Sequence, residues 1–466
     1  MDKIQLKTVW KEKYAIVPEQ LQKIKRIPAI ATAFNTNIDA VIKISGTHLK
    51  ELIEKNQISL KDLDNITLNG FRKPSDALIG IVKCFSRGIA EEWTTADISI
   101  YHWLEKEIGY DHLQMGGQGG IIANVMALLG IKRVITHTNS HPSLQAQQFL
   151  DLDNLLAFDN HGELMQASHI SREDTPMIHW IIEFNKGDRF TIEDKTFVCP
   201  KSNRFIATYD PLNMNLVINK HFTRYLNENK VSYLVLSGFH PLLADNNGLK
   251  LIKDVVPIIE KWKKANPELI VHLEIASTQD AQIRLAIIQE IAPLSDSIGL
   301  NEREMLDLLS VTNQQKLMQR IEQNVNACNL FDALLFLKNY LKIPRIQLHM
   351  FGLYLTLQDS NFPYSANDNL KGMITAAVVA SSKASVGALV HYDDITKTLG
   401  QEISDQGLEE LFALSQKLNK PELLEIGICN IDNYILSAVP TILVAQPKTL
   451  VGMGDTISSI SLVAGR

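Results

Sequence analysis

Short apolar segments, each followed at once by polar residues, recur along this chain between longer stretches that are typical of helices. Five of them lie in the second half of the sequence: YLVLSGFH (233–240), LIVHLEIAS (269–277), DSIGLNE (296–302), RIQLHMFG (345–352) and TILVAQP (441–447). Buried strands that alternate with helices form a mainly parallel sheet with helices on both faces. Ligands bind such sheets at the carboxyl ends of the strands, where these polar residues would gather. The pattern predicts an α/β fold with one large α/β/α body.

Two stretches of the first half interrupt this alternation with additional extended segments. In the second stretch, PMIHWIIEF (176–184) and RFTIEDKTFV (189–198) are typical of two hairpin strands joined through residues 185–188. We expect both stretches to contribute to one small β-rich lid that is discontinuous in sequence. The predicted division assigns residues 1–39, 114–174 and 205–466 to the large domain, and residues 40–113 and 175–204 to the lid.

The overall charge and composition exclude several classes of partner. The chain has 466 residues and a formal net charge of −6, from 46 lysines and arginines against 52 aspartates and glutamates. A weakly acidic chain has no general electrostatic attraction to nucleic acid or to an anionic membrane. Charges interrupt the N-terminal apolar runs, no run approaches the roughly 18 residues of a membrane-spanning helix, and four separated cysteines suit a reducing compartment. We therefore expect a cytoplasmic protein without nucleic-acid or membrane partners, whose oligomeric state stays open.

The segment VGMGDTISS (451–459) near the C-terminus carries the strongest chemical signal. Gly452 and Gly454 let the backbone turn tightly and approach a ligand, and the apolar segment that follows would begin a helix whose free N–H groups bind an anion. Asp455 at the helix entrance is placed to deprotonate a hydroxyl during phosphoryl transfer. The alternative is that Asp455 or Thr456 only caps the helix.

Two carboxylates at strand ends suggest a metal site. His272 and Glu274 alternate on one strand and would share a face of the sheet. Asn301 and Glu304 follow the next strand, with the spacing of a helix capping box, which is the structural alternative. The functional interpretation is that Glu274 and Glu304 hold Mg²⁺ through water, because this ion keeps much of its hydration shell, and that it neutralises phosphate charge during transfer.

Two further segments suit a sugar rather than a dinucleotide. GGQGGIIAN (116–124) lacks the GxGxxG spacing, and no acidic residue follows it at the required distance. Its glycine amides would approach substrate hydroxyls, although a plain helix-start turn is the alternative. Asn37 and Asp39 would together donate and accept hydrogen bonds with a polyol, unless they only form an Asx turn.

Six motifs in this order resemble the ADP-dependent sugar kinases, the archaeal-type glucokinases and 6-phosphofructokinases of the ribokinase-like superfamily. The resemblance extends over nearly the whole chain. The motifs are NTNID (35–39), GGQGGIIAN (116–124), SNRF (202–205), HLE (272–274), NERE (301–304) and VGMGDTISS (451–459).

The resemblance implies a ribokinase-like α/β/α large domain with a smaller β-rich lid domain that closes over the sugar. It implies ADP as phosphoryl donor, and Mg²⁺ or another divalent cation as cofactor. The catalytic residues that it implies are Asp455 as base, Gly452 and Gly454 in the anion hole, and Arg204 near the nucleotide phosphates. The sugar site would contain Asn37, Asp39, Gly116, Gly117 and Gln118. The nucleotide would contact Asn301, His349, Val444 and Gly454, and the metal would involve Glu274, Glu304 and Asp455.

The sugar is the main open question. A phosphofructokinase must hold the phosphate of fructose 6-phosphate, and Lys186 and Arg189 at the predicted hairpin turn of the lid are basic candidates, with a solvated turn as the alternative. Glucokinases of the family use a lid glutamate, for which the segment 73–93 offers Asp76, Glu91 and Glu92. The basic turn favours fructose 6-phosphate, with a glucokinase or a bifunctional enzyme as alternatives.

Two hypotheses of other classes remain. An ATP-dependent ribokinase-type nucleoside or vitamin kinase would have a much shorter chain and would not combine HxE with NxxE in this way. A non-catalytic nucleotide-binding protein would need no base, so the presence of Asp455 argues against it. The choice of ADP over ATP rests on the resemblance alone.

Overall fold

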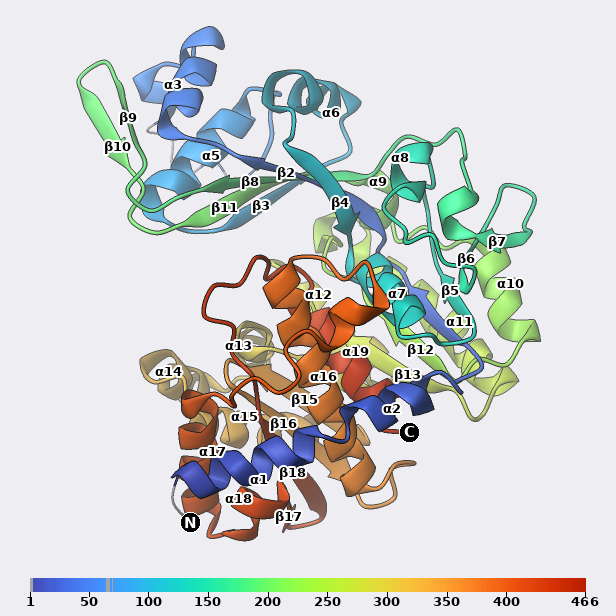
Figure 1. Cartoon of the computed structure of the whole chain (residues 1–466). Helices are drawn as coiled ribbons and strands as arrows, with labels where there is room; N and C mark the ends of the chain where they lie inside the picture. The colour runs from blue at the N-terminus through green and yellow to red at the C-terminus, as the bar shows by residue number, and fades with distance from the viewer. Residues whose placement is uncertain (1–2, 64–67, 69) are drawn as a thin grey trace.

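Most of the apolar segments become the parallel centre of one large sheet (Figure 1). The computed structural model describes residues 3–63, 68 and 70–466. Within them, an eleven-stranded sheet runs parallel from β15 to β6 and carries antiparallel strands at both edges. Its strands, in spatial order, are β17 (Ile428–Ile431), β18 (Tyr434–Pro440), β16 (Leu353–Asp359), β15 (Arg345–Met350), β14 (Ser297–Leu300), β13 (Ile270–Glu274), β12 (Tyr233–Leu236), β1 (Ile30–Ala33), β5 (Val134–Thr136), β6 (Leu155–Phe158) and β7 (Leu164–Gln166).

The predicted strand TILVAQP is wrong. The last strand of the sheet, β18, ends at Pro440, and residues 441–447 are irregular. The reason lies in the register, because Pro440 pairs with Leu353, the first residue of β16. Beyond this pair Thr441 N–H still donates to the carbonyl of Gly352 (2.9 Å), in the turn before β16, but no strand continues there, so an apolar composition alone does not produce a strand.

Helices cover both faces of the large sheet. One layer contains α7 (Gln118–Leu128), α16 (Ala366–Val386) and α19 (Met453–Val463), which pack side by side. The other contains α11 (Gly248–Ala265), α13 (Glu302–Val311) and α15 (Ala327–Leu341), and the N-terminal helices α1 (Lys3–Tyr14) and α2 (Val17–Ile24) pack against α16. Other helices of the chain are α4 (Leu60–Leu63), α8 (Ser143–Ala146), α9 (Pro211–Met214), α10 (Lys220–Glu228), α12 (Ala281–Ala286), α14 (Gln315–Gln323), α17 (Asp405–Leu418) and α18 (Glu422–Ile426).

A second, five-stranded sheet lies apart from the first and has its own core. Trp180 and Phe205 on one of its faces pack among apolar residues of the covering helices, which Figure 1 shows on the side away from the large body. The opposite face is polar. The sheet order is β3 (Glu91–Thr95), β11 (Asn203–Tyr209), β8 (Ile178–Phe184), β2 (Asn37–Lys43) and β4 (His112–Gly116), and the helices are α3 (Gly46–Lys55), α5 (Asp76–Arg87) and α6 (Ile98–Trp103).

The hairpin predicted between residues 176–184 and 189–198 is wrong. Strand β8 pairs with β2 and β11, whereas residues 189–198 fold back on themselves as β9 (Arg189–Ile192) and β10 (Lys195–Val198). Glu193 makes this tight turn possible by adopting a left-handed conformation, with φ of 53°. The turn lacks the Asn-Gly or Asp-Gly pair that marks such hairpins, so no turn motif in the sequence predicts it.

The small sheet also reaches beyond the segments predicted for the lid. Strand β2 begins at Asn37 and β11 continues to Tyr209, so the predicted boundaries at 39/40 and 204/205 both fall inside strands. Asn37 and Asp39 thus lie on a strand of the small sheet and not in an Asx turn. In the described part of the chain, no helix is long and apolar enough to cross a membrane.

Candidate active site

Helix α19 begins at the GMGD turn, where two positions leave no room for a side chain. Gly452 adopts a left-handed conformation with φ of 61°, and a Cβ there would lie 2.8 Å from the side chain of Ile121. A Cβ on Gly454 would lie 2.6 Å from His349 Nε2. The N–H groups in the first turn of a helix have no acceptor within the helix, and the helix dipole adds positive potential there. The turn is therefore suited to bind an anion.

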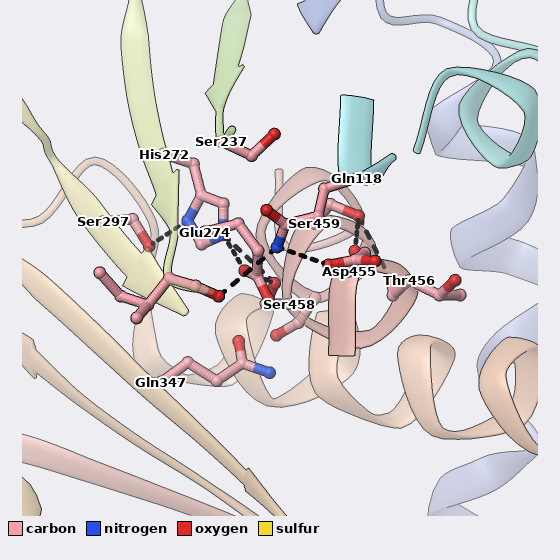
Figure 2. A network of polar contacts seen from close by, with 12 residues as sticks. Gln118, Ser237, His272, Glu274, Ser297, Gln347, Asp455, Thr456, Ser458 and Ser459 are labelled. Carbon is pink, nitrogen blue, oxygen red and sulfur yellow. Dashed lines mark hydrogen bonds and ion pairs between the residues drawn. The ribbon is translucent and has the colours of Figure 1, made fainter. Parts of the chain in front are cut away.

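The side chain of Asp455 projects from this turn and is held by the glycine-rich loop. Its Oδ1 accepts a hydrogen bond of 2.9 Å from Gln118 Nε2, at the start of α7 (Figure 2). Burial raises the pKa of Asp455, and the bond from Gln118 and the charge of Lys383 oppose this rise. The capping alternative is wrong, because no side chain caps α19 and Thr456 Oγ1 donates instead to the carbonyl of Gly452 (2.7 Å).

Lys383, on α16, was not found by sequence reasoning. Its side chain is buried, and Nζ donates to the carbonyl oxygen of Gly452 at 3.2 Å and to Thr456 Oγ1 at 3.3 Å. Burial lowers the pKa of Lys383 to about 8, although Asp455 partly offsets the effect. A buried cation thus sits beside the anion-binding turn. In the sequence, Lys383 is one lysine in a long apolar helix, and nothing nearby marks it.

His272 and Glu274 share one face of β13, as predicted, and belong to a buried polar network (Figure 2). His272 Nε2 lies 3.2 Å from Glu274 Oε2, and Ser458 on α19 also donates to that oxygen. On the other side of the ring, Nδ1 lies 3.0 Å from Ser297 Oγ. Gly299 makes room for this arrangement, since a Cβ there would collide with Glu274 Oε2.

The predicted capping box of α13 is present. Asn301 Oδ1 accepts from the backbone of Arg303 and Glu304, and Glu304 Oε2 accepts from the backbone of Asn301 (2.7 Å). Glu304 is also buried, and burial raises its pKa to about 8, with the nearby charge of Asp455 adding to the rise and the bond from the Asn301 backbone opposing it.

The three acidic side chains fit a hydrated divalent cation. Burial, followed by the charges of Asp455 and Glu304, raises the pKa of Glu274 well above its ordinary value. A divalent cation would relieve this repulsion and favour the ionised forms. Within residues 3–63, 68 and 70–466, no three His, Cys, Asp or Glu side chains converge closely enough to ligate an ion directly. Glu274, Glu304 and Asp455 are the side chains that could hold a divalent cation here, with water between, as Mg²⁺ commonly is held.

The predicted sugar residues meet where β2 pairs with β4. Asn37 Nδ2 donates to Asp39 Oδ1 (3.2 Å), and both side chains are buried. A Cβ on Gly116 would collide with Asp39 Oδ1, and a Cβ on Gly117 would lie 2.6 Å from Asn37 Oδ1. Burial raises the pKa of Asp39 to about 6, against the opposing effects of His179, Asn37 and other donors. Asn37 and Asp39 thus present paired polar atoms beside the glycine loop that holds Asp455.

Two residues at the polar face of the small sheet were missed: His179 on β8, and Asp210, which directly follows β11. His179 pairs in register with Asp39, and its Nε2 lies 3.0 Å from the buried carboxylate of Asp210. Burial by itself lowers the pKa of His179, but Asp210 and the neighbouring carboxylates outweigh it and the net shift is upward. Glu92 accepts a 2.6 Å bond from Thr208 on the same face. His179 and Asp210 lie 31 residues apart, so no local pattern could link them.

The three acidic residues considered for a glucose contact lie in different surroundings. Asp76 is buried at the start of α5, where it accepts from the backbone of Arg72 and Lys73. Glu91 pairs with Lys83 at 2.9 Å on the core side of β3. Glu92 alone of the three lies on the polar face, where its charge acts on Asp39 and His179.

The basic candidates are exposed and make no contact with Asp455. Arg204 lies on β11 opposite Glu183, on the face that carries His179. Lys186 lies in the turn after β8, where its backbone N–H donates to Ser202 Oγ (2.8 Å), and Arg189 begins β9. All three residues lie near the end of the small sheet at which β8 ends and β11 begins.

The predicted nucleotide residues are spread over several elements. His349 is buried against Gly454, and burial lowers its pKa to about 4, so its ring is neutral. Neither of its ring nitrogens has a hydrogen-bond partner among the described residues. Val444 is half-buried and lines an open hollow of about 630 Å³ between the segment that follows β18 and residues 400–402.

Comparison with known proteins places these features in a family. The conserved region described as ADP-specific phosphofructokinase/glucokinase matches residues 28–464. An ADP-dependent glucose/glucosamine kinase of Pyrococcus abyssi is 30% identical and the match covers 98% of each chain. An ADP-specific phosphofructokinase of Methanosarcina acetivorans is 28% identical, with 93% of this chain and 92% of that protein covered.

Two solved structures are similar to this protein over the whole length of its chain. The last common ancestor of ADP-dependent phosphofructokinases from Methanosarcinales superposes with a TM-score of 0.84 at 28% identity, covering 100% of this chain and 99% of that one. An ADP-dependent kinase in complex with fructose 6-phosphate and ADPβS superposes with a TM-score of 0.83 at 27% identity, covering 100% and 98%. The similarity therefore includes both sheets.

Proposed function

Because the chain belongs to the ADP-specific phosphofructokinase/glucokinase family, we propose that this ADP-dependent sugar kinase of ribokinase-like fold acts on fructose 6-phosphate. The reaction transfers the β-phosphate of ADP to the 1-hydroxyl of the sugar and gives fructose 1,6-bisphosphate and AMP. One observation carries the proposal: Gln118, in the loop that adjoins Asn37 and Asp39, holds Asp455 at the anion-binding turn. The sugar loop and the phosphoryl site thus meet at one carboxylate.

Asp455 would act as the base. Its carboxylate takes the proton of the 1-hydroxyl as the sugar oxygen attacks phosphorus in line, and the bond between the β-phosphorus and the bridging oxygen breaks to release AMP. The N–H groups around Gly452 and Gly454 would bind the transferred group, whose charge they are oriented to stabilise. The bond from Gln118 keeps the Asp455 carboxylate turned toward this site.

Glu274 and Glu304 would hold Mg²⁺ through water, and the bound ion would supply charge neutralisation at the nucleotide phosphates. His349 and Gly454 would border the nucleotide, with Asn301 and Val444 further along it. A buried, neutral His349 without a protein partner has both ring nitrogens available to a ligand.

The phosphate of the sugar would be held at the basic outer end of the small sheet. Lys186 offers the charge for this contact, and Arg204, on the polar face, is placed to reach the nucleotide phosphates when the lid closes. The two bodies have separate cores, which suits a closing motion that excludes water from the reaction.

Glucose is a second candidate acceptor, and the position of Glu92 favours it. Its carboxylate lies on the polar face with Asp39 and His179, where it would accept a hydrogen bond from a sugar hydroxyl. The relatives support either acceptor, because a phosphofructokinase and a glucose/glucosamine kinase match at 28% and 30% identity. A bifunctional enzyme is thus the alternative.

Initial rates with two donors and two acceptors test the proposal. We expect turnover with ADP and fructose 6-phosphate in the presence of Mg²⁺, loss of turnover when the ion is chelated, and little turnover with ATP. Lys186→Ala should raise the KM for fructose 6-phosphate, while Glu92→Ala should affect only the use of glucose. Turnover with glucose alone would refute the choice of fructose 6-phosphate, and a preference for ATP would refute the choice of donor.

A further inference from the structure

Arg345 is a fully buried cation whose hydrogen-bond partners in the described part of the chain are all neutral. It lies on β15, and its side chain has no exposed surface. Its four hydrogen bonds all go to neutral groups: Asn369 Oδ1 (3.0 Å), Ser297 Oγ (2.8 Å), Gln347 Oε1 (2.7 Å) and Ser461 Oγ (3.0 Å). Among the described residues no carboxylate lies within ion-pair distance of it. Burial of a charge on neutral partners is costly, which calls for a role beyond packing.

The bond from Arg345 favours one direction for the next hydrogen bond. Arginine has donors only, so Ser297 Oγ must accept from Arg345 Nη1 and its own hydroxyl hydrogen is free to donate. The other partner of Ser297 Oγ is His272 Nδ1, at 3.0 Å. Because Arg345 occupies one lone pair of Ser297 Oγ, the hydroxyl hydrogen is oriented toward Nδ1, and the contacts on the opposite side of the ring decide whether Nδ1 accepts it.

The opposite side of the His272 ring agrees with this direction. With Nδ1 as acceptor, a neutral ring carries its proton on Nε2, and Nε2 faces Glu274 Oε2 at 3.2 Å and Ser458 Oγ at 3.3 Å. Ser458 gives its own hydrogen to Glu274, so both neighbours of Nε2 accept. A proton on Nδ1 would instead turn the lone pair of Nε2 toward the carboxylate, which is unfavourable.

We propose that Arg345 and Ser297 are positioning residues that fix the tautomer of His272 and, through it, the orientation of the Glu274 carboxylate at the metal-facing end of β13. Three hydrogen bonds in series lead from Arg345 to Ser297, from Ser297 to His272, and from His272 to Glu274. With one oxygen of Glu274 held by His272 and Ser458, the carboxylate cannot rotate freely, and its second oxygen is aimed in a defined direction. This inference rests on the proposed metal role of Glu274.

Two serines provide a matched pair of variants. Ser297 and Ser461 are both fully buried, and both accept a hydrogen bond from Arg345, but only Ser297 contacts His272. Ser297→Ala and Ser461→Ala each remove one buried hydroxyl and leave one arginine N–H unpaired, so both should lower Tm similarly. Only Ser297→Ala interrupts the series of hydrogen bonds that leads from Arg345 to Glu274.

The first measurement is ¹⁵N NMR of the histidine-labelled full chain without metal, with His272 assigned by the loss of its signals in His272→Asn. We expect Nε2–H in the unsubstituted protein and in Ser461→Ala, and a change in the shifts of both ring nitrogens in Ser297→Ala. Ser297→Thr, which keeps the hydroxyl, should restore them. Nδ1–H in the unsubstituted protein, or equal spectra for the two alanine variants, would overturn the proposal.

The second measurement is the Mg²⁺ concentration that gives half-maximal turnover. Loss of a partner that orients a metal ligand typically weakens metal affinity by about 10- to 100-fold, so Ser297→Ala should require about tenfold more Mg²⁺ while Ser461→Ala should not. If both alanine variants require the same increase in Mg²⁺ concentration, the effect is structural and the proposal fails. If Glu274→Gln leaves the Mg²⁺ requirement unchanged, the metal role of Glu274 fails, and the NMR result still decides the tautomer.

Discussion

Replacement of Lys383 with methionine tests whether a buried charge supports the anion-binding turn. Methionine has a similar length and suits a buried position in α16, but it has no charge and no donor. The substitution removes the bonds from Nζ to the Gly452 carbonyl and to Thr456 Oγ1 (3.2 and 3.3 Å). It also removes the cation that lowers the pKa of Asp455.

The expected loss of activity is large. Hydrogen bonds to charged groups contribute about 1.5–3 kcal/mol each, and loss of one donor from an oxyanion site typically lowers kcat by about 10²–10³-fold. Lys383 contacts the turn through Gly452 and Thr456 rather than through its N–H groups, so we expect the lower end, about 10²-fold in kcat. The KM for ADP should change much less, because the N–H groups that bind phosphate remain.

Lys338→Met is the matched control. Lys338 is a second buried lysine of the large body, and its Nζ binds Asp359 and the carbonyl of Ile343. Both substitutions should lower Tm, but only Lys383→Met should lower kcat. If folded Lys383→Met keeps kcat within about twofold of the unsubstituted enzyme, or if the two variants lose kcat equally, the role of Lys383 is refuted.

The contributions of Lys383 to stability and to activity should change with pH in opposite directions. Burial lowers the pKa of Lys383 to about 8 from 10.5 in the unfolded chain. Between these values the unfolded state binds the extra proton, so the contribution of Lys383 to the free energy of unfolding increases with pH, by up to about 3 kcal/mol. Activity should instead fall above pH 8 as the charge is lost. Lys383→Met should remove both trends, which urea titrations and kcat measurements across pH 7–10.5 would show.

Two other substitutions test the metal and sugar sides of the site. Gly299→Ala places a Cβ against Glu274 Oε2, so it should cost about 1–3 kcal/mol of stability and raise the Mg²⁺ requirement; an unchanged requirement would show that Glu274 is not held as described. Asp39, whose pKa is raised to about 6, should lose its charge below that pH, so the KM for the sugar should rise there more steeply in the unsubstituted enzyme than in Asp39→Asn, and parallel profiles would contradict this.

The features that were predicted correctly are those that depend on residues close together in the sequence. The parallel strands, the helix start at the GMGD turn and the capping box of Asn301 and Glu304 all follow from residues close together in the chain. The shared face of His272 and Glu274 follows from the two-residue period of a strand.

The features that were missed depend on neighbours that are distant in sequence. Residues 441–447 are apolar enough for a strand, but β16 begins at Leu353 opposite Pro440, so after the bond from Thr441 to Gly352 no strand continues beside them. Lys383 is placed beside Gly452 only when α16 packs against α19, 69 residues further along the chain. His179 and Asp210 likewise meet only in the folded small sheet. Such pairs have no signature in one sequence.

The most direct test of the account is the turnover and ADP affinity of Asp455→Ala and Asp455→Asn. If Asp455 is the base of an ADP-dependent sugar kinase, both variants should lose turnover with ADP and the sugar by at least about 10²–10⁴-fold, the usual contribution of a general base. They should still bind ADP in calorimetry, because the anion-binding turn remains. Full turnover in Asp455→Ala would contradict the proposed chemistry.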